Sequence, residues 1–267
     1  MIRRKASATI DGPKETGLRR NAWTAGPEVT TGRSGTQVIR NRSKPAGATP
    51  KIRGIIFDLD GVLLSTDEFH YRAWKELADR EDIPFDRTIN HRLRGVSRMD
   101  SLNIILEKAG RPYSEEEKAA MADFKNRRYR ELLGNLTPEA TTPAVWKLLA
   151  ELRQRGIRLA IGSASKNTPT IMERVGLDKV IDVVVDGNDI TRGKPDPEGF
   201  LKAAERMGLK PDECVVVEDA PTGVEAGRRA GMHVLAIGGR ELHPDEAWLA
   251  RSLDGMSADE LLACGRV

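Results

Sequence analysis

Two carboxylates stand two residues apart, Asp58 and Asp60, after a short apolar run and directly before Gly61. At the extended end of a strand, residues i and i+2 point to the same side, so the two carboxylates share one face. One carboxylate of such a pair can attack phosphorus, while the other donates and accepts protons. The spacing therefore indicates phosphoryl transfer, with Asp58 as nucleophile and Asp60 as general acid/base.

Further polar groups follow three later apolar runs. Ser163, Lys194 and the pair Glu218 and Asp219 each come just after one of these runs. The carboxyl ends of parallel strands meet at one edge of a sheet, so these groups are expected to converge on the two aspartates. An isolated Asp pair or Lys-Pro turn is common in solvated loops. Four such features in order, each at a strand end, favour a site.

A magnesium ion is expected among the acidic groups, because Mg²⁺ prefers hard oxygen ligands and commonly uses one or two carboxylates. Asp58 and Asp219 can supply side-chain oxygens, and Asp60 can supply its backbone carbonyl. Glu218 could ligate the ion or orient water bound to it. Such an ion would keep the nucleophilic carboxylate ionised and shield it from an incoming phosphate dianion.

A phosphate site is expected beside the metal. Ser163 and Ala164 lie where a strand meets the next helix, and a hydroxyl together with backbone N–H groups at a helix start suits a phosphate. Lys194 carries the positive charge that the equatorial oxygens of a transferred phosphoryl group require. These three residues are therefore predicted to hold the phosphate that reacts.

The elements that must position these groups alternate between strands and helices after Pro143. Strands are expected at 157–161, 181–185, 214–218 and 232–237, and a glycine closes each helix between them. The helices are expected at 145–155, 167–175, 197–207 and 221–230. This alternation is typical of an α/β fold, a doubly wound parallel sheet with helices on both faces.

The pattern divides the chain into three parts. Residues 1–50 lack a hydrophobic period and are expected to form a disordered basic extension. Residues 66–137 show helical periodicity and no convincing strand, which predicts a small all-helical insertion. Residues 51–65 and 138–267 form the α/β core around that insertion.

Charge and cysteine content narrow the cellular setting. Residues 1–50 hold ten Lys/Arg against three Asp/Glu, a net of +7, so the remainder carries −4 of the total +3. Two cysteines cannot build a disulfide framework, and no apolar stretch is long enough for a membrane span, which favours a cytoplasmic protein. The extension could be an organelle transit peptide, a nucleic-acid-binding tail or a solvated segment. No nucleic-acid motif supports the second reading, and a monomer is expected.

Four motifs resemble those of the haloacid dehalogenase superfamily. They are FDLDGVLL, GSAS, GKPDP and VVEDAPTG, in this order along the chain. The helical insertion between the first and second motifs is placed like the α-helical cap of one subclass. The resemblance covers about residues 52–238 and implies a Rossmann-like core, Mg²⁺ dependence and chemistry through an aspartyl phosphate.

The cap loop Arg94-Gly-Val-Ser-Arg98 and the run Ser163-Ala-Ser-Lys-Asn167 resemble those of β-phosphoglucomutases within the superfamily. The resemblance implies interconversion of β-D-glucose 1-phosphate and glucose 6-phosphate through β-glucose 1,6-bisphosphate. A mutase needs a second phosphate site, for which Arg98 offers a forked donor. The substrate-binding residues that the resemblance implies are Thr66, His70, Trp74, Gly95, Val96, Ser97, Arg98, Ser101, Lys125, Ser165, Lys166 and Asn167.

Other interpretations stay open at this point. Trp74 could belong to the cap core, His70 could be a polar residue at the domain junction, and Lys125 could lie on a solvated helix face. Ala220 stands where many relatives carry a hydroxyl. A sugar-phosphate phosphatase of the same fold is the main alternative. A phosphoacceptor signalling module would place its aspartate after a middle strand and would lack a cap.

Overall fold

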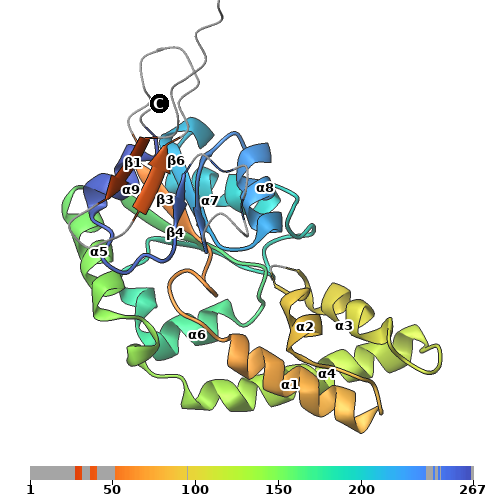
Figure 1. Cartoon of the computed structure of the whole chain (residues 1–267). Helices are drawn as coiled ribbons and strands as arrows, with labels where there is room; N and C mark the ends of the chain where they lie inside the picture. Colours follow the sequence, from red (N-terminus) through yellow and green to blue (C-terminus); the bar gives the residue numbers. More distant parts are fainter. Residues whose placement is uncertain are drawn as a thin grey trace, which may run out of the picture.

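The computed structural model of the chain describes residues 28–31, 37–40, 52–94, 96–238, 243, 246 and 248–265 (Figure 1). Its centre is a six-stranded sheet in the order β5-β4-β3-β6-β7-β8, and every neighbouring pair is parallel. The strands are β3 (Gly54–Phe57), β4 (Arg158–Gly162), β5 (Val183–Val185), β6 (Cys214–Glu218), β7 (His233–Ile237) and β8 (Leu249–Ala250). The predicted doubly wound parallel sheet is confirmed.

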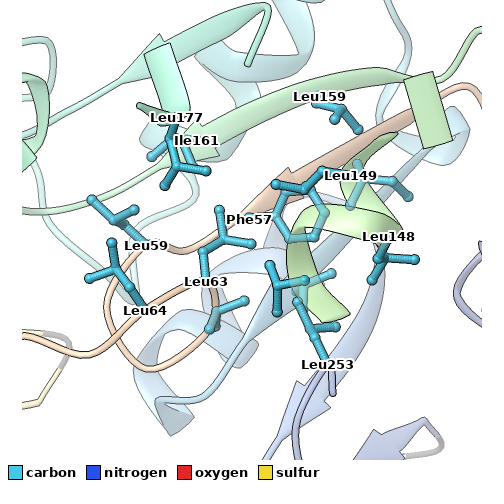
Figure 2. Packing of buried hydrophobic residues seen from close by; sticks show 14 of the residues in the cluster. Phe57, Leu59, Leu63, Leu64, Leu148, Leu149, Leu159, Ile161, Leu177 and Leu253 are labelled. Carbon is cyan, nitrogen blue, oxygen red and sulfur yellow. The ribbon is translucent and has the colours of Figure 1, made fainter. Parts of the chain in front are cut away.

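The central strand β3 buries both of its faces. Ile55 and Phe57 point into one hydrophobic cluster, and Ile56 points into another on the opposite face, as the twofold alternation of a strand requires. Figure 2 shows Phe57 packed near Leu148 and Leu149 in the first cluster. A strand covered on both sides must be apolar throughout, and all four residues of β3 are buried.

Helices cover both faces of this sheet. The first cluster includes apolar residues of α5 (Pro143–Gln154), α6 (Thr168–Val175) and α9 (Ala258–Ala263). The second includes residues of α7 (Glu198–Met207) and α8 (Pro221–Arg229). The 3₁₀ turns η3 (Leu177–Lys179) and η4 (Pro211–Glu213) lie between these elements. From β3 the chain first builds the sheet on one side, with β4 and β5, and then on the other side, with β6, β7 and β8. The strand order therefore reverses at β3, and its carboxyl end is a topological switch point.

The cap segment, residues 66–137, has its own hydrophobic cluster, which includes Trp74, Leu102 and Ile105. Its helices are α1 (Asp67–Arg80), α2 (Arg87–His91), α3 (Arg98–Leu106), α4 (Glu115–Leu132) and the 3₁₀ turn η1 (Leu133–Asn135). Figure 1 shows α1 to α4 as a helical lobe beside the sheet. A further 3₁₀ turn, η2 (Pro138–Ala140), leads back to α5.

Two short strands lie within the segment that was expected to be disordered. The strands β1 (Glu28–Thr31) and β2 (Gln37–Arg40) pair in antiparallel register. These residues include β-branched Val, Thr and Ile, which favour extended backbone. The expectation for residues 1–50 as a whole stays a prediction. The rest of residues 1–51 lies outside the described part of the chain. Among the described residues, no helix has the length and apolar character needed to cross a membrane.

Candidate active site

The predicted reactive groups meet at the carboxyl edge of the central strands. Asp58 directly follows β3, and its backbone N–H donates to the carbonyl of Val217 in β6 at 2.9 Å. Ser163 directly follows β4, and Glu218 is the last residue of β6. The parallel register of β3 with both neighbours places these three strand ends side by side.

Lys194 reaches this edge from the loop before α7. Its Nζ contacts Asp58 Oδ1 and lies 2.6 Å from Glu218 Oε1. All three side chains are buried. Burial opposes the charge of Lys194, but the two carboxylates outweigh it and raise the pKa of the ammonium group above its usual range. The lysine therefore stays protonated beside the predicted nucleophile.

The carboxylates at this edge of the sheet carry more negative charge than Lys194 can neutralise. Burial raises the pKa of Asp58 to about 6, and the nearby Glu218 adds to the effect against the attraction of Lys194. Burial and the neighbouring carboxylates, Glu218 first, raise the pKa of Asp219 to about 8. One lysine among these acidic groups leaves an uncompensated negative charge that a divalent cation can neutralise.

The donor chemistry of this cluster therefore fits Mg²⁺, which takes carboxylate and carbonyl oxygens. Asp58 and Asp219 would hold the ion, as would the backbone carbonyl of Asp60. Across the described residues, no three His, Cys, Asp or Glu side chains have the geometry of a metal site. The cluster therefore matches Mg²⁺ in its charge and in its type of donor atom.

Two glycines let the backbone approach these carboxylates closely. Gly61 has a φ of 92°, and a Cβ there would lie 2.3 Å from Asp219 Oδ2. A Cβ at Gly223 would lie 1.8 Å from Glu218 Oε1. Any larger residue at either position would displace the acidic side chain. Glu218 is further fixed by the backbone N–H of Ala220, which donates to its Oε2 at 2.7 Å.

Asp60 is bound by the residue that precedes the first cap helix. The backbone N–H of Thr66 donates to Asp60 Oδ1 at 2.5 Å, and its hydroxyl donates to Oδ2 at 2.6 Å. Because that hydroxyl proton is already used, the Tyr129 hydroxyl donates to Thr66 at 2.9 Å. Burial raises the pKa of Asp60 to about 6, which suits a group that must both hold and release a proton near neutral pH.

A buried lysine of the cap segment, Lys125, interacts electrostatically with Asp60. Lys125 is only 2% exposed, and its Nζ lies 2.9 Å from His70 Nδ1. It also lies over the rings of Trp74 and Tyr129, at 4.7 Å and 4.6 Å. Burial and the charge of Arg98 lower the pKa of Lys125 well below its usual range, whereas Asp60 opposes that change. The alternative interpretation, in which Lys125 lies on a solvated face of its charged helix, is therefore excluded.

The positive charges beside Asp60 are not balanced by a direct ion pair among the residues that the structure describes. Burial, then Lys125 and Arg98, lower the pKa of His70, so its ring is neutral and accepts from Lys125. Burial also lowers the pKa of Arg98, with Asp123 as the attractive charge. In the described part of the chain, neither Arg98 nor Lys125 forms an ion pair within 4.0 Å. We call Arg98 and Lys125, together with the neutral His70 ring that contacts Lys125, the cap cation group.

The remaining predicted residues are placed as follows. Ser97 caps α3 by accepting from the backbone N–H of Asp100 at 3.2 Å, and Ser101 is buried in that helix. Val96 is half-buried, Lys166 is exposed, and Gly95 lies outside the described residues. Trp74 is buried in the cap cluster, so its packing role is real whatever else it contacts.

The loop after β4 is held by its own hydroxyl groups and by one contact with the cap segment. Ser163 Oγ accepts from the backbone N–H of Ser165, and Ser165 Oγ accepts from that of Asn167, each at 3.2 Å. The Asn167 side chain donates to Asn126 Oδ1 on α4 at 2.9 Å. This hydrogen bond joins the core loop to the cap segment. Ala164 lies between the two serines and has a half-buried side chain.

Sequence reasoning missed three residues that bear on the site. Tyr129 lies four positions after Lys125, and this helical spacing places the two on one face of α4, although it does not show what that face contacts. Asn126 stood beside Lys125 without an assigned role. The His243 ring is buried, and its Nε2 lies 2.8 Å from the Asp219 carbonyl and 3.0 Å from that of Ile237. It follows the last motif, and no local pattern marks it.

Comparison with known proteins places this arrangement in a family. The family model for haloacid dehalogenase-like hydrolases matches residues 52–231. The chain belongs to this family. Both the predicted superfamily and its Rossmann-like core with helical insertion are thereby confirmed.

The relatives include a mutase and a phosphatase. A β-phosphoglucomutase of Bacillus subtilis is 40% identical, over 70% of this chain and 84% of that protein. A phosphorylated carbohydrates phosphatase of Thermotoga maritima is 31% identical, over 68% of this chain and 82% of that one. The crystal structure of a β-phosphoglucomutase from Clostridium difficile superposes with a TM-score of 0.76 at 33% identity, covering 80% of this chain and 97% of that chain. Family membership thus makes the chain a haloacid dehalogenase-like enzyme, and its relatives include a phosphoglucomutase and a phosphatase.

Proposed function

We propose that the protein is a β-phosphoglucomutase, which interconverts β-D-glucose 1-phosphate and glucose 6-phosphate through β-glucose 1,6-bisphosphate. The observation that carries this proposal is the cap cation group, whose Lys125 interacts with Asp60 and whose Lys125 and Arg98 form no ion pair within the described part of the chain. A mutase must hold one phosphate at the nucleophile and another at a distance. A positive group across from the reactive edge supplies the second site. The similarity to the Bacillus subtilis mutase supports the same assignment.

The roles of the reactive residues follow from their contacts. In one half-reaction, the C6 hydroxyl oxygen of glucose 1-phosphate attacks the phosphorus on Asp58, the Asp58 O–P bond breaks, and Asp60 accepts the hydroxyl proton. In the other, the freed Asp58 carboxylate attacks the C1 phosphorus of the bisphosphate, and Asp60 returns the proton to the departing C1 oxygen. Lys194 neutralises charge beside Asp58 in both steps. Bound Mg²⁺ would supply further positive charge to the phosphoryl oxygens.

The cap segment would supply substrate recognition and exclude water. Arg98 offers a planar fork for the distal phosphate, and Lys125 and His70 lie beside it. Thr66 connects the first cap helix to both oxygens of Asp60, so movement of the cap segment also moves or releases the general acid/base. Excluding water keeps the phosphate on Asp58 for a sugar hydroxyl rather than for hydrolysis.

A coupled assay tests the proposal. The protein is incubated with Mg²⁺, β-glucose 1-phosphate and a trace of β-glucose 1,6-bisphosphate, and both glucose 6-phosphate and free phosphate are followed. We expect glucose 6-phosphate to form faster than free phosphate, and the α anomer serves as the matched control substrate. Faster release of free phosphate would overturn the mutase assignment. That result would favour the second candidate, a sugar-phosphate phosphatase like the Thermotoga maritima relative.

A further inference from the structure

Lys194 is presented by a loop whose conformation needs support from outside the loop. The residues between β5 and α7 carry the lysine toward Asp58 and Glu218. Within the loop, the backbone N–H of Asp196 donates to the Gly193 carbonyl at 3.0 Å. This turn fixes the tip but does not fix where the tip lies relative to the sheet. Something must tie the start of the loop to the helix that follows it.

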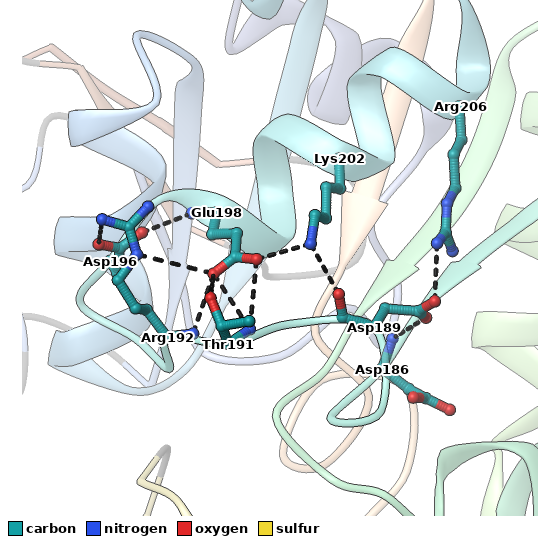
Figure 3. A network of polar contacts seen from close by, with 8 residues as sticks. All are labelled: Asp186, Asp189, Thr191, Arg192, Asp196, Glu198, Lys202 and Arg206. Atoms are coloured by element: carbon teal, nitrogen blue, oxygen red, sulfur yellow. Dashed lines mark hydrogen bonds and ion pairs between the residues drawn. The ribbon is translucent and has the colours of Figure 1, made fainter.

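Glu198, the first residue of α7, makes that connection (Figure 3). Its carboxylate accepts from the backbone N–H of Thr191 at 3.2 Å, from the Thr191 hydroxyl at 2.9 Å and from the backbone N–H of Arg192 at 2.9 Å. Lys202, one helical turn further on, donates from its Nζ to Glu198 Oε1 at 2.6 Å. The Glu198 carboxylate therefore closes a ring of chain that runs from residue 191 to residue 198, with Lys194 at its tip.

The same face of α7 continues this support. Lys202 also donates to the Asp189 carbonyl at 2.7 Å, and Arg206 donates to Asp189 Oδ1 at 2.7 Å. Glu198, Lys202 and Arg206 are spaced four residues apart, so they form one row along the helix (Figure 3). Each of the three binds the segment that leads into the lysine loop.

The opposite face of α7 fixes the helix itself. Phe200, Ala203 and Met207 are buried in the second core cluster. The Phe200 ring lies 5.0 Å from Lys194 Nζ, so the helix also contacts the lysine directly. A rigid helix that is packed on one side can hold a loop on the other. The side chain of Glu198 is only 11% exposed, although it comes from a surface loop junction.

We infer that Glu198 is a positioning residue that holds the Lys194 loop in register with the Asp58 nucleophile. The inference rests on the proposed aspartyl-phosphate chemistry and holds for a mutase or a phosphatase alike. The carboxylate does not touch the reacting atoms, and it acts by fixing where the Lys194 ammonium group lies. Its four donors include two backbone N–H groups that an apolar replacement would leave without a partner.

The test uses Glu198→Ala and Glu198→Gln, with acetyl phosphate and Mg²⁺ as a small substrate that needs no cap contact. We expect kcat to fall by about 10-fold to 100-fold with little change in KM, because small displacements of a catalytic group are costly. The glutamine variant keeps one acceptor oxygen and should fall less. Glu213→Ala is the matched control, because Glu213 likewise binds the backbone N–H of Lys210 and an arginine, Arg53, in a loop away from Lys194.

A double-mutant cycle with Lys194→Ala separates positioning from general stability. If Glu198 acts through Lys194, adding Glu198→Ala to Lys194→Ala should lower kcat by less than about twofold. Multiplicative losses, or an unchanged kcat in Glu198→Ala that is folded by circular dichroism, would overturn the inference. A wild-type protein that forms no phosphoenzyme from acetyl phosphate would instead contradict the proposed function, so the two failures are distinguishable.

Discussion

The two sides of the candidate site differ in how their charges are paired. At the sheet edge, Lys194 is buried between the carboxylates of Asp58 and Glu218. On the cap side, Lys125 is equally buried, but its close polar partner is the neutral ring of His70. Keeping a buried lysine charged without a carboxylate costs free energy, which is why the pKa of Lys125 lies well below its usual range. A cost of this kind is typical of a site whose missing partner is an anionic ligand.

This difference assigns separate tasks to the two sides. The sheet edge comes with its cation and nucleophile already in contact, which is the preorganisation that phosphoryl transfer needs. The cap segment instead holds positive charge in place for a group that arrives with the substrate. Chemistry on any phosphate should therefore depend on the edge, and discrimination among phosphates should depend on the cap segment. Four experiments test this division.

The first and largest effect is expected from Asp58→Asn. The amide keeps the shape of the side chain but cannot form the phosphoenzyme. We expect the turnover of both acetyl phosphate and β-glucose 1-phosphate to fall by a factor on the order of 10⁴ or more. Steady-state rates with both substrates are the measurement. Substantial residual turnover of either one would show that the nucleophile lies elsewhere.

The second effect should be confined to sugar phosphates. In Arg98→Ala we expect kcat/KM for β-glucose 1-phosphate to fall by about 100-fold, as loss of a partly buried charge-assisted contact implies. Acetyl phosphate turnover should change by less than about twofold, because that substrate has no distal phosphate. Arg94→Ala is the matched control, since Arg94 is 40% exposed and pairs with Asp67 at 2.9 Å. Equal losses on both substrates would contradict the division between edge and cap segment.

The sheet edge could be predicted from the sequence more fully than the cap side. Asp58, Ser163 and Glu218 follow apolar runs, and the rule that ligands bind at strand ends brings them together without coordinates. The fold followed from the same alternation of runs. The last part of the chain was harder to predict from the sequence. Its strand β8 has only two residues and its helix α9 only six, which is too short for a clear hydrophobic period.

The cap side could be predicted only through motifs. Helical periodicity showed that Lys125 lies in a charged helix, which favoured a solvated face, yet its side chain is buried. Burial of a lysine depends on which helix packs against which, and no local pattern carries that information. The contacts of Tyr129 and His243 escaped for the same reason, since each joins segments distant in sequence.

The third experiment uses Mg²⁺ to separate the two sides. In its folded environment Asp219 has a pKa of about 8, far above the ordinary value of 3.8, so the ionised carboxylate destabilises the metal-free protein. Metal-free stability should therefore fall as pH rises toward about 8. Because Mg²⁺ binds the ionised form, its stabilising effect should grow over the same range.

The measurement is the melting temperature with saturating Mg²⁺ or with EDTA. We expect Mg²⁺ to raise Tm by roughly 5–10 °C at about pH 9 and by less at about pH 6. Asp219→Asn should lose most of this pH-dependent gain, whereas Arg98→Ala should keep it. A gain that is independent of pH, or one that disappears in the cap variant, would place the metal away from the acidic edge.

The smallest effect is expected where the two sides meet. Asn126→Ala removes the hydrogen bond from Asn167, a neutral contact worth about 1 kcal/mol. A cap segment held less firmly should admit water to the phosphoenzyme more often, so free phosphate should rise relative to glucose 6-phosphate by about fivefold. Formation of the phosphoenzyme from acetyl phosphate should hardly change, because that step needs neither water nor the cap segment.

Asn188→Ala provides the matched control for this contact. The Asn188 amide donates to the Lys166 carbonyl at 3.3 Å, within the core and on the same side of the site. The substitution removes one amide hydrogen bond of similar strength and leaves the contacts of the cap segment unchanged. If both variants shift the product ratio equally, loop stability and not the connection to the cap segment controls water entry. A shift confined to Asn126→Ala would show that the pairing of the two sides protects the phosphoenzyme from hydrolysis.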